Sequence, residues 1–114
     1  MLAVTQPGET SMAAQLVVTY RTPSDTAAFD RHYHDIHAPL ARNIPGLRRF
    51  ETSAGPVMTP EGPSDVHLIA ILHFDSLADI GAAFASPEGQ AAAADVANFA
   101  SGGASMLMYE TTET

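Results

Sequence analysis

The chain contains no cysteine and no lysine among its 114 residues. Without cysteine it forms no disulfide and has no thiolate to act as a nucleophile or as a metal ligand. Without lysine it cannot form a Schiff base with a carbonyl substrate. Any reaction that its own side chains carry out must therefore use histidine, tyrosine, arginine, carboxylates or hydroxyl groups.

Positive charge is also scarce, because five arginines stand against 13 acidic residues and give a formal net charge of −8. Binding to nucleic acid or to an anionic membrane surface needs a positive patch, and the sequence offers none. No apolar run approaches the roughly 20 residues that span a bilayer. The first residues lack the basic segment of a signal peptide. We therefore expect a cytoplasmic protein that binds neither nucleic acid nor membranes.

Length and composition indicate one globular domain, since 46% of the residues are hydrophobic and 16% are charged. The first residues show no strand or helix pattern before an apolar, β-branched segment begins at Gln15. We expect residues 1–14 to be a flexible N-terminal extension and residues 15–114 to form the single domain.

The residue pattern predicts an α+β domain with four strands, at 15–21, 47–54, 66–74 and 105–112. One helix lies between the first two strands, with Ser24 as its expected N-cap, and a second begins at Ser76. Residues 55–65 are rich in proline and glycine and read as a loop. The order β-α-β-β-α-β is that of the ferredoxin-like fold, an antiparallel four-stranded sheet with both helices on one face.

The other face of this sheet is left open by the helices. The segment 66–74, "VHLIAILHF", is apolar on both of its faces, as expected for a strand that is covered on both sides. We therefore expect a homodimer in which two sheets form one barrel with the helices outside, a dimeric α/β barrel.

The first helix carries an apolar stripe at helical spacing, made of Phe29, Tyr33, Ile36 and Leu40. On a helical wheel His37 lies at the edge of the stripe, about 60° from its centre, and so borders both the core and any cavity beside it. His34 lies further round toward solvent, at most at the mouth of a pocket. His32 falls on the other flank of the helix.

Pro39 interrupts this helix two residues after His37. Proline has no amide hydrogen to give to the carbonyl of Asp35, and its ring disfavours α geometry at Ala38. We expect the helix to kink or end at 37–39 and to leave carbonyls free near His37. One of these would fix the tautomer of the His37 ring by accepting a hydrogen bond.

Two further histidines, His67 and His73, lie six residues apart on the strand 66–74 and are expected to share one of its faces. If that face meets the helices, His73 approaches His37; if not, His73 lies at the dimer interface. His34 and His37 are three residues apart, a spacing that permits a shared metal ion. No third ligand stands at a recognised spacing, so we expect no metal site.

The segment from Tyr20 to Phe50, "YRTPSDTAAFDRHYHDIHAPLARNIPGLRRF", resembles the signature half of the EthD-like family of dimeric α/β-barrel proteins. The matching pieces are Tyr20 followed by Pro23, then Phe29 and Tyr33, the "HAPLA" that starts at His37, and "PGLRRF". The later segment "HFDSLADIGAAFASPEG" resembles the second half of the family. The resemblance covers residues 15–112.

This resemblance implies a small dimeric protein with a pocket between helices and sheet in each subunit. The family takes its name from a gene cluster for degradation of ethyl tert-butyl ether. Related barrels include cofactor-free monooxygenases, lactone isomerases and polyketide cyclases, which act on small and often cyclic molecules. By this likeness His37 is the motif histidine, and Tyr33 and Tyr20 are walls of the pocket.

The main hypothesis is a small-molecule enzyme of catabolism or secondary metabolism that needs no cofactor. His37 would be its general acid or base, because histidine titrates near neutral pH. Tyr33 and Tyr20 would orient the substrate, with His73 as an optional second acid or base and His34 at the pocket mouth. The alternatives are an oxidoreductase that uses oxygen directly or a haem, a non-catalytic ligand carrier or accessory subunit, and a purely structural dimer module.

Overall fold

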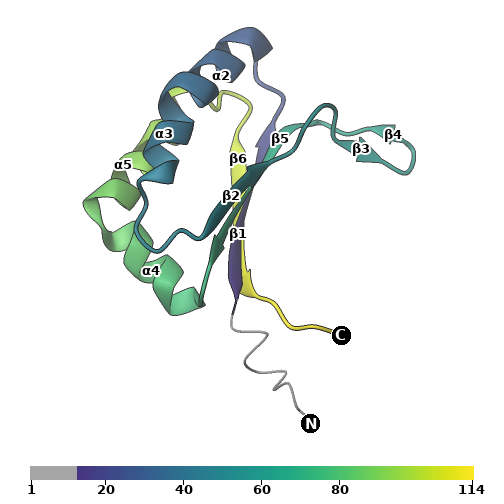
Figure 1. Cartoon of the computed structure of the whole chain (residues 1–114). Coiled ribbons are helices and arrows are strands. Elements are labelled where there is room, and N and C mark those ends of the chain that lie inside the picture. The colour runs from purple at the N-terminus through teal and green to yellow at the C-terminus, as the bar shows by residue number, and fades with distance from the viewer. Residues whose placement is uncertain (1–12) are drawn as a thin grey trace.

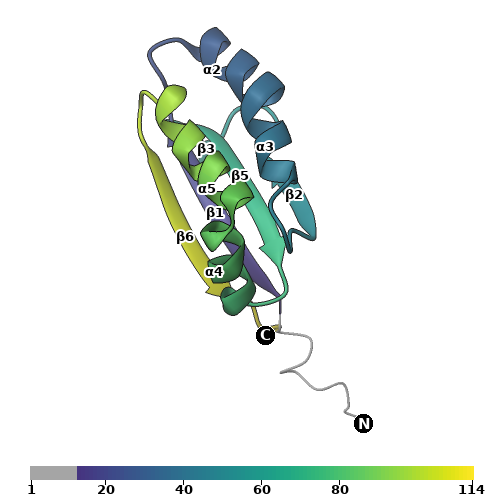
Figure 2. The same cartoon turned by 90° about the vertical axis from the view of Figure 1, so that its left-hand side faces the viewer.

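The protein folds into one four-stranded antiparallel sheet with all of its helices on one face (Figures 1 and 2). The structure is a computed structural model and describes residues 13–114. The strands run in the order β2–β5–β1–β6, and their bounds are Ala14–Arg21 for β1, Arg49–Thr52 for β2, Val66–Phe74 for β5 and Ala104–Glu110 for β6. This is the ferredoxin-like arrangement, so the predicted fold class is confirmed.

The helices come in two groups, one after β1 and one after β5. The first is a nearly continuous helix built from α2 (Thr26–His32), a π-helical turn η1 (Tyr33–His37) and α3 (Ala38–Arg42). The second consists of α4 (Leu77–Ala85), α5 (Pro87–Asp95) and a short 3₁₀ turn η2 (Val96–Asn98). Figure 2 shows α3 beside β2 and the second group over the middle of the sheet. No helix of the described residues is long and apolar enough to cross a membrane.

Side-chain caps set where these helices begin. Ser76 accepts a hydrogen bond from the amide of Asp79 and starts α4, as predicted. Ser86 does the same for Gly89 and starts α5, with Pro87 in the first turn. The prediction for α2 was wrong by one residue, because Asp25 is the N-cap.

The segment predicted to be a plain loop contains a small hairpin, β3 (Met58–Thr59) paired with β4 (Gly62–Pro63). It extends away from the sheet on the side opposite the helices (Figure 1). The positive φ angles at Gly55 and Gly62 permit the turns at its base and tip.

The core lies between the helices and one face of the sheet. Alternate residues of β1 and β5 fill it from the sheet side, namely Ala14, Leu16, Val18, Tyr20, Ala70, Leu72 and Phe74. His73 therefore lies on the face of β5 that points away from the helices. The predicted extension 1–14 lies almost wholly outside the described residues. Ala14 was assigned to it wrongly, because Ala14 is fully buried and begins β1.

Candidate functional site

A π-helical turn in the first helix decides which histidine points inward. The amide of Ala38 donates to the carbonyl of Tyr33, five residues back, and so replaces the four-residue step of an α-helix. The wider turn advances each residue by about 85° instead of 100°, so the inward stripe moves by one position after Tyr33. His37 is therefore buried, with 6% of its surface exposed, whereas Ile36 is 48% exposed. The prediction that Ile36 belongs to the apolar stripe was wrong for this reason.

Pro39 does not end the helix, so that alternative of the prediction was wrong; the helix departs from α geometry just before it, in the π turn Tyr33–His37. It occupies the first turn of α3, where a proline is well tolerated. Ala38 keeps α-helical angles, with φ −59° and ψ −43°. No backbone carbonyl is needed to orient the His37 ring, because a side chain from the second helix group does so.

That side chain is Asp95, the last residue of α5. Its Oδ2 lies 3.0 Å from Nδ1 of His37, and its Oδ1 lies 2.9 Å from Nε2 of His32. Asn98 donates from Nδ2 to Oδ1 at 3.0 Å. Asp95 is 6% exposed, so one buried carboxylate joins two histidines and an asparagine. The placement of His32 on a remote flank was wrong, because the π turn brings His32 and His37, five residues apart, to the same side of the helix.

The electrostatics of the cluster fix the state of His37. Burial by itself would raise the pKa of Asp95, but the hydrogen bonds from Asn98, His32 and His37 outweigh it and hold that pKa below the usual range. Asp95 is therefore a carboxylate that only accepts hydrogen bonds, and Nδ1 of His37 carries the hydrogen. Burial lowers the pKa of His37, against the opposing pull of Asp95, so at neutral pH the ring is uncharged and its Nε2 has a free lone pair.

Aromatic rings hold this cluster in place. The ring of Phe99 lies 4.8 Å from that of His37 and 5.2 Å from that of His32, measured between centroids. The ring of Tyr33 lies 5.2 Å from His37 and 5.7 Å from Tyr20. Burial raises the pKa of both tyrosines, so both phenols keep their protons. The hydrogen bond between them raises the pKa of Tyr20 and lowers that of Tyr33, as expected when Tyr20 donates to Tyr33 and leaves the hydrogen of Tyr33 available.

A cavity between the helices and the sheet meets the two tyrosines and His37. It has a volume of about 30 Å³, room for about two water molecules. Its polar side chains are Tyr20, Tyr33 and His37, and the remaining wall is apolar, formed by residues such as Leu16, Ile44, Leu72 and Val96. The cavity thus brings together three of the five residues that the sequence suggested for the site.

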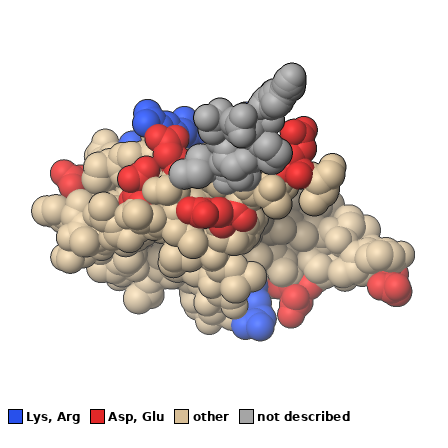
Figure 3. Space-filling view, turned by 90° about the horizontal axis from the view of Figure 1, so that it is seen from below, with Lys and Arg blue, Asp and Glu red and all other residues tan. Residues whose placement is uncertain are grey.

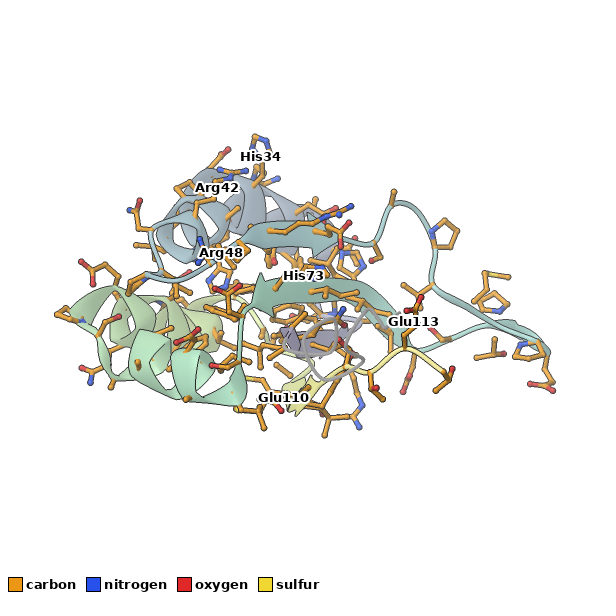
Figure 4. The ribbon with its side chains drawn as sticks, turned by 60° about the horizontal axis from the view of Figure 1, so that its bottom comes forward. His34, Arg42, Arg48, His73, Glu110 and Glu113 are labelled. Atoms are coloured by element: carbon orange, nitrogen blue, oxygen red, sulfur yellow. The ribbon has the colours of Figure 1, made fainter. Side chains whose placement is uncertain are left out.

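The other two predicted residues lie elsewhere. His73 points to the open face of the sheet, where its Nε2 lies 2.8 Å from Glu51, so it does not approach His37 (Figure 4). His34 is exposed, within 3.0 Å of Asp35, and lines a separate groove that also touches Tyr33.

His67 and His73 were expected to share one face of the strand, and this prediction was wrong. The register between β1 and β5 slips after Tyr20, so that His67 is an extra residue in the ladder, and a β-bulge turns its ring toward the helices. There it meets Phe29 and hydrogen-bonds Asp30 at 2.8 Å. No group of three histidine or acidic side chains in residues 13–114 is arranged to hold a metal ion.

Sequence reasoning missed Asp95, Asn98 and His32. Asp95 follows an alanine-rich helix, "AAAADVANF", and is the only charged residue of that stretch. The available signal for a buried acid was a lone carboxylate directly before Val96 and Phe99, which were expected to face inward. Nothing local, however, indicates that its partner stands 58 residues earlier.

Comparison with known proteins places the chain in a family, since residues 21–103 match the EthD domain. The protein belongs to the EthD family. Over 97 residues it is 51% identical to an uncharacterized 11.0 kDa protein of Rhodococcus erythropolis from the thcB–thcC intergenic region, a match that covers 84% of this chain and 92% of the relative.

Two solved structures show how far the EthD fold extends. An EthD family protein from Bacillus halodurans is 32% identical, with a TM-score of 0.80, over 87% of this chain and 98% of its own. The hydroxynitrile lyase of Passiflora edulis is 21% identical, with a TM-score of 0.71, over 90% of this chain and 95% of its own. The second likeness shows a shared fold.

Proposed function

We propose that this EthD protein is a cofactor-independent enzyme that uses His37 to move a proton on a small, largely apolar substrate. The observation that carries the proposal is the buried pair of His37 and Asp95 at the wall of a cavity that also holds two phenols. A hydroxynitrile lyase among the proteins of similar fold supports a small-molecule reaction on this scaffold.

In this mechanism Asp95 holds the His37 ring by its Nδ1 hydrogen, which leaves Nε2 to accept a proton from carbon or oxygen of the substrate. Asp95 also stabilises the imidazolium that forms, as a carboxylate does in other histidine-based active sites. The phenol of Tyr33 donates a hydrogen bond to the oxygen on which negative charge develops, and Tyr20 supports it by donating to Tyr33. Return of the proton from Nε2 to another atom completes an isomerisation, cyclisation or elimination.

The structure gives less support to a passive role. A carrier for an apolar ligand gains nothing from a buried, hydrogen-bonded histidine in the wall of its pocket, since burying polar groups costs free energy. A purely structural dimer module likewise gains nothing from two histidines held on a buried carboxylate. The cavity has room for about two water molecules, so an organic substrate reaches His37 only when side chains of the cavity wall move.

Oxygen chemistry without a cofactor is the second candidate, because it begins with the same step. Removal of a proton from a phenol or an activated carbon gives an electron-rich anion, and such an anion can react with O₂ directly. Oxygen uptake during turnover separates this reaction from simple proton transfer.

We also propose that the enzyme is a homodimer built through the open face of the sheet. Register places Leu107, Val17 and Ile71 side by side across that face, and Leu107 is 72% exposed. An apolar row of this kind on an otherwise soluble domain favours a partner surface.

The test of the catalytic proposal is His37→Gln, which keeps a hydrogen-bond donor for Asp95 but has no titratable nitrogen. The assay follows exchange of the acidic protons of benzoylacetone with D₂O by NMR, together with cleavage of an aromatic cyanohydrin. We expect His37→Gln to lower the protein-catalysed rate by about 100-fold or more.

His73→Gln is the comparison variant, because glutamine retains a donor for Glu51 on the other face of the sheet. It should turn over as the wild type does. A wild-type rate for His37→Gln, with catalysis present, would show that His37 is not the base.

A further inference from the structure

A second hollow, distinct from the small cavity, runs along the β2 edge of the domain. One wall is a stripe of His34, Ala38 and Arg42, and the other is formed by Phe50, Thr52 and Leu68. We call it the β2-side groove. Its volume is about 350 Å³, within the range of small-molecule sites, and Ala38 lines it between His34 and Arg42. Figure 4 shows His34 and Arg42 projecting from the same helix.

Arg42 is the feature of the groove that points to a ligand. Three of the five arginines are paired with acids, Arg21 with Asp65, Arg48 with Asp75 and Arg49 with Glu51. Within the described chain, Arg42 and Arg31 make no ion pair, and Arg42 lines the β2-side groove. Figure 3 shows how widely acidic side chains are spread on one face of this protein of charge −8, and the charge of Arg42 faces the groove without one of them as its partner.

The one acid in the groove does not neutralise Arg42. Asp30 accepts a hydrogen bond from Nε2 of His67 at 2.8 Å, at the other end of the groove. The charge of Arg42 does reach the inner phenol: burial raises the pKa of Tyr33, and the Arg42 guanidinium opposes that rise. Tyr33 and Phe50 line both the groove and the small cavity, so the two spaces are neighbours.

We propose that the β2-side groove binds the carboxylate of an organic acid through Arg42, with the apolar part of the acid against Phe50 and Leu68. A planar guanidinium binds a carboxylate through two parallel hydrogen bonds, which a lysine would not supply. Thr52 on the facing wall offers a hydroxyl to the same group. The substrate class is thus an aromatic or aliphatic monocarboxylate.

This inference rests on the proposed function only in one respect, that the reactive end of the acid reaches past Tyr33 to His37. Binding of the carboxylate itself does not depend on His37. The two ideas are therefore separable by experiment, since His37→Gln should remove turnover and leave the affinity for a carboxylate unchanged.

The probe is benzoate, with benzamide as its uncharged analogue of the same shape. Each is titrated into ¹⁵N-labelled full-length protein up to roughly 50 mM, because one charge-assisted contact gives affinity in the millimolar range. We expect benzoate to shift the amide signals of residues 34–42 and 50–52, with an affinity that falls as salt is added. Benzamide should bind more weakly and show no salt dependence.

The matched variants are Arg42→Gln and Arg31→Gln, the two arginines that lack an acidic partner. We expect Arg42→Gln to weaken benzoate binding about tenfold or more, whereas Arg31→Gln binds as the wild type does. Arg42→Lys, which keeps the charge at the end of α3, should fall between them. The proposal is overturned if benzoate shifts no groove signal, if both glutamine variants bind it equally, or if benzamide binds as well as benzoate.

Discussion

One carboxylate serving two imidazoles is the central feature at the scale of residues. Asp95 carries a single negative charge, and both imidazoles share it. His32 is the outer member, with 22% of its side chain exposed, and His37 is the inner one, with 7%. Burial lowers the pKa of His37, and positive charge on His32 lowers it further by a smaller amount. The outer histidine therefore helps to keep the inner one in its neutral form, in which Nε2 can accept a proton.

His32→Gln tests this coupling, because glutamine keeps a donor for Asp95 and removes the charge. We expect the pKa of His37, which lies below 6.5 in the wild type, to rise toward 6.5. Two-dimensional NMR of the imidazole nitrogens measures this pKa. His34→Gln, on the exposed side of the same helix, should leave it unchanged. If the pKa of His37 is the same in His32→Gln as in the wild type, His32 does not influence the charge of His37.

The same lowered pKa has a consequence for stability. Between the pKa of folded His37 and about 6.5, the unfolded chain binds a proton that the folded protein does not. The contribution of His37 to the free energy of unfolding is therefore constant above that range and decreases as the pH falls through it. Urea unfolding of wild type and His37→Gln, followed across this range, should show a smaller loss of stability on acidification for the variant.

At the scale of elements, the junction between α4 and α5 places Asp95. Gly89 lies where a methyl group would overlap the carbonyl of Ala83 and come within 2.7 Å of Cα of Phe84. The two helices can meet this closely only because Gly89 has no side chain. By contrast, nothing lies within 4 Å of the corresponding position at Gly81 in α4.

These two glycines give a matched prediction. Gly81→Ala should raise the free energy of unfolding by about 0.5–1 kcal/mol, because alanine favours the helix and meets no neighbour. Gly89→Ala should lower it by at least about 1 kcal/mol, because α5 must move away from α4. Urea unfolding measures both changes. Equal effects at the two positions would show that close helix packing at Gly89 is not a constraint.

At the scale of the whole molecule, the open sheet face predicts assembly. Leu107→Glu places a charge in the row of Leu107, Val17 and Ile71, which should convert a dimer to a monomer because burying an unpaired charge is costly. Sedimentation velocity or light scattering measures the change. Ile36→Glu, a charge at an exposed position on the helix side, should leave the dimer intact. A wild-type protein that sediments as a monomer would contradict the assembly.

Local signals in the sequence are sufficient to predict the order of the elements, and His37 as the functional histidine stays a prediction. Strand periodicity, Ser76 as a cap and the proline-rich breaks are local signals, and local signals are enough to place β1, β5 and α4 almost to the residue. The sequence does not indicate which face of β5 meets the helices, because apolar residues alternate in the same way on both faces.

Only the tertiary structure decided the partner of His37 and the phase of its helix. Asp95 reaches His37 across 58 residues, a contact that no local pattern encodes. The π turn depends on whether the amide of Ala38 donates to the fourth or to the fifth preceding carbonyl. Packing against Phe99 and the bond to Asp95 favour the second, and one displaced hydrogen bond then exchanges Ile36 for His37 in the core.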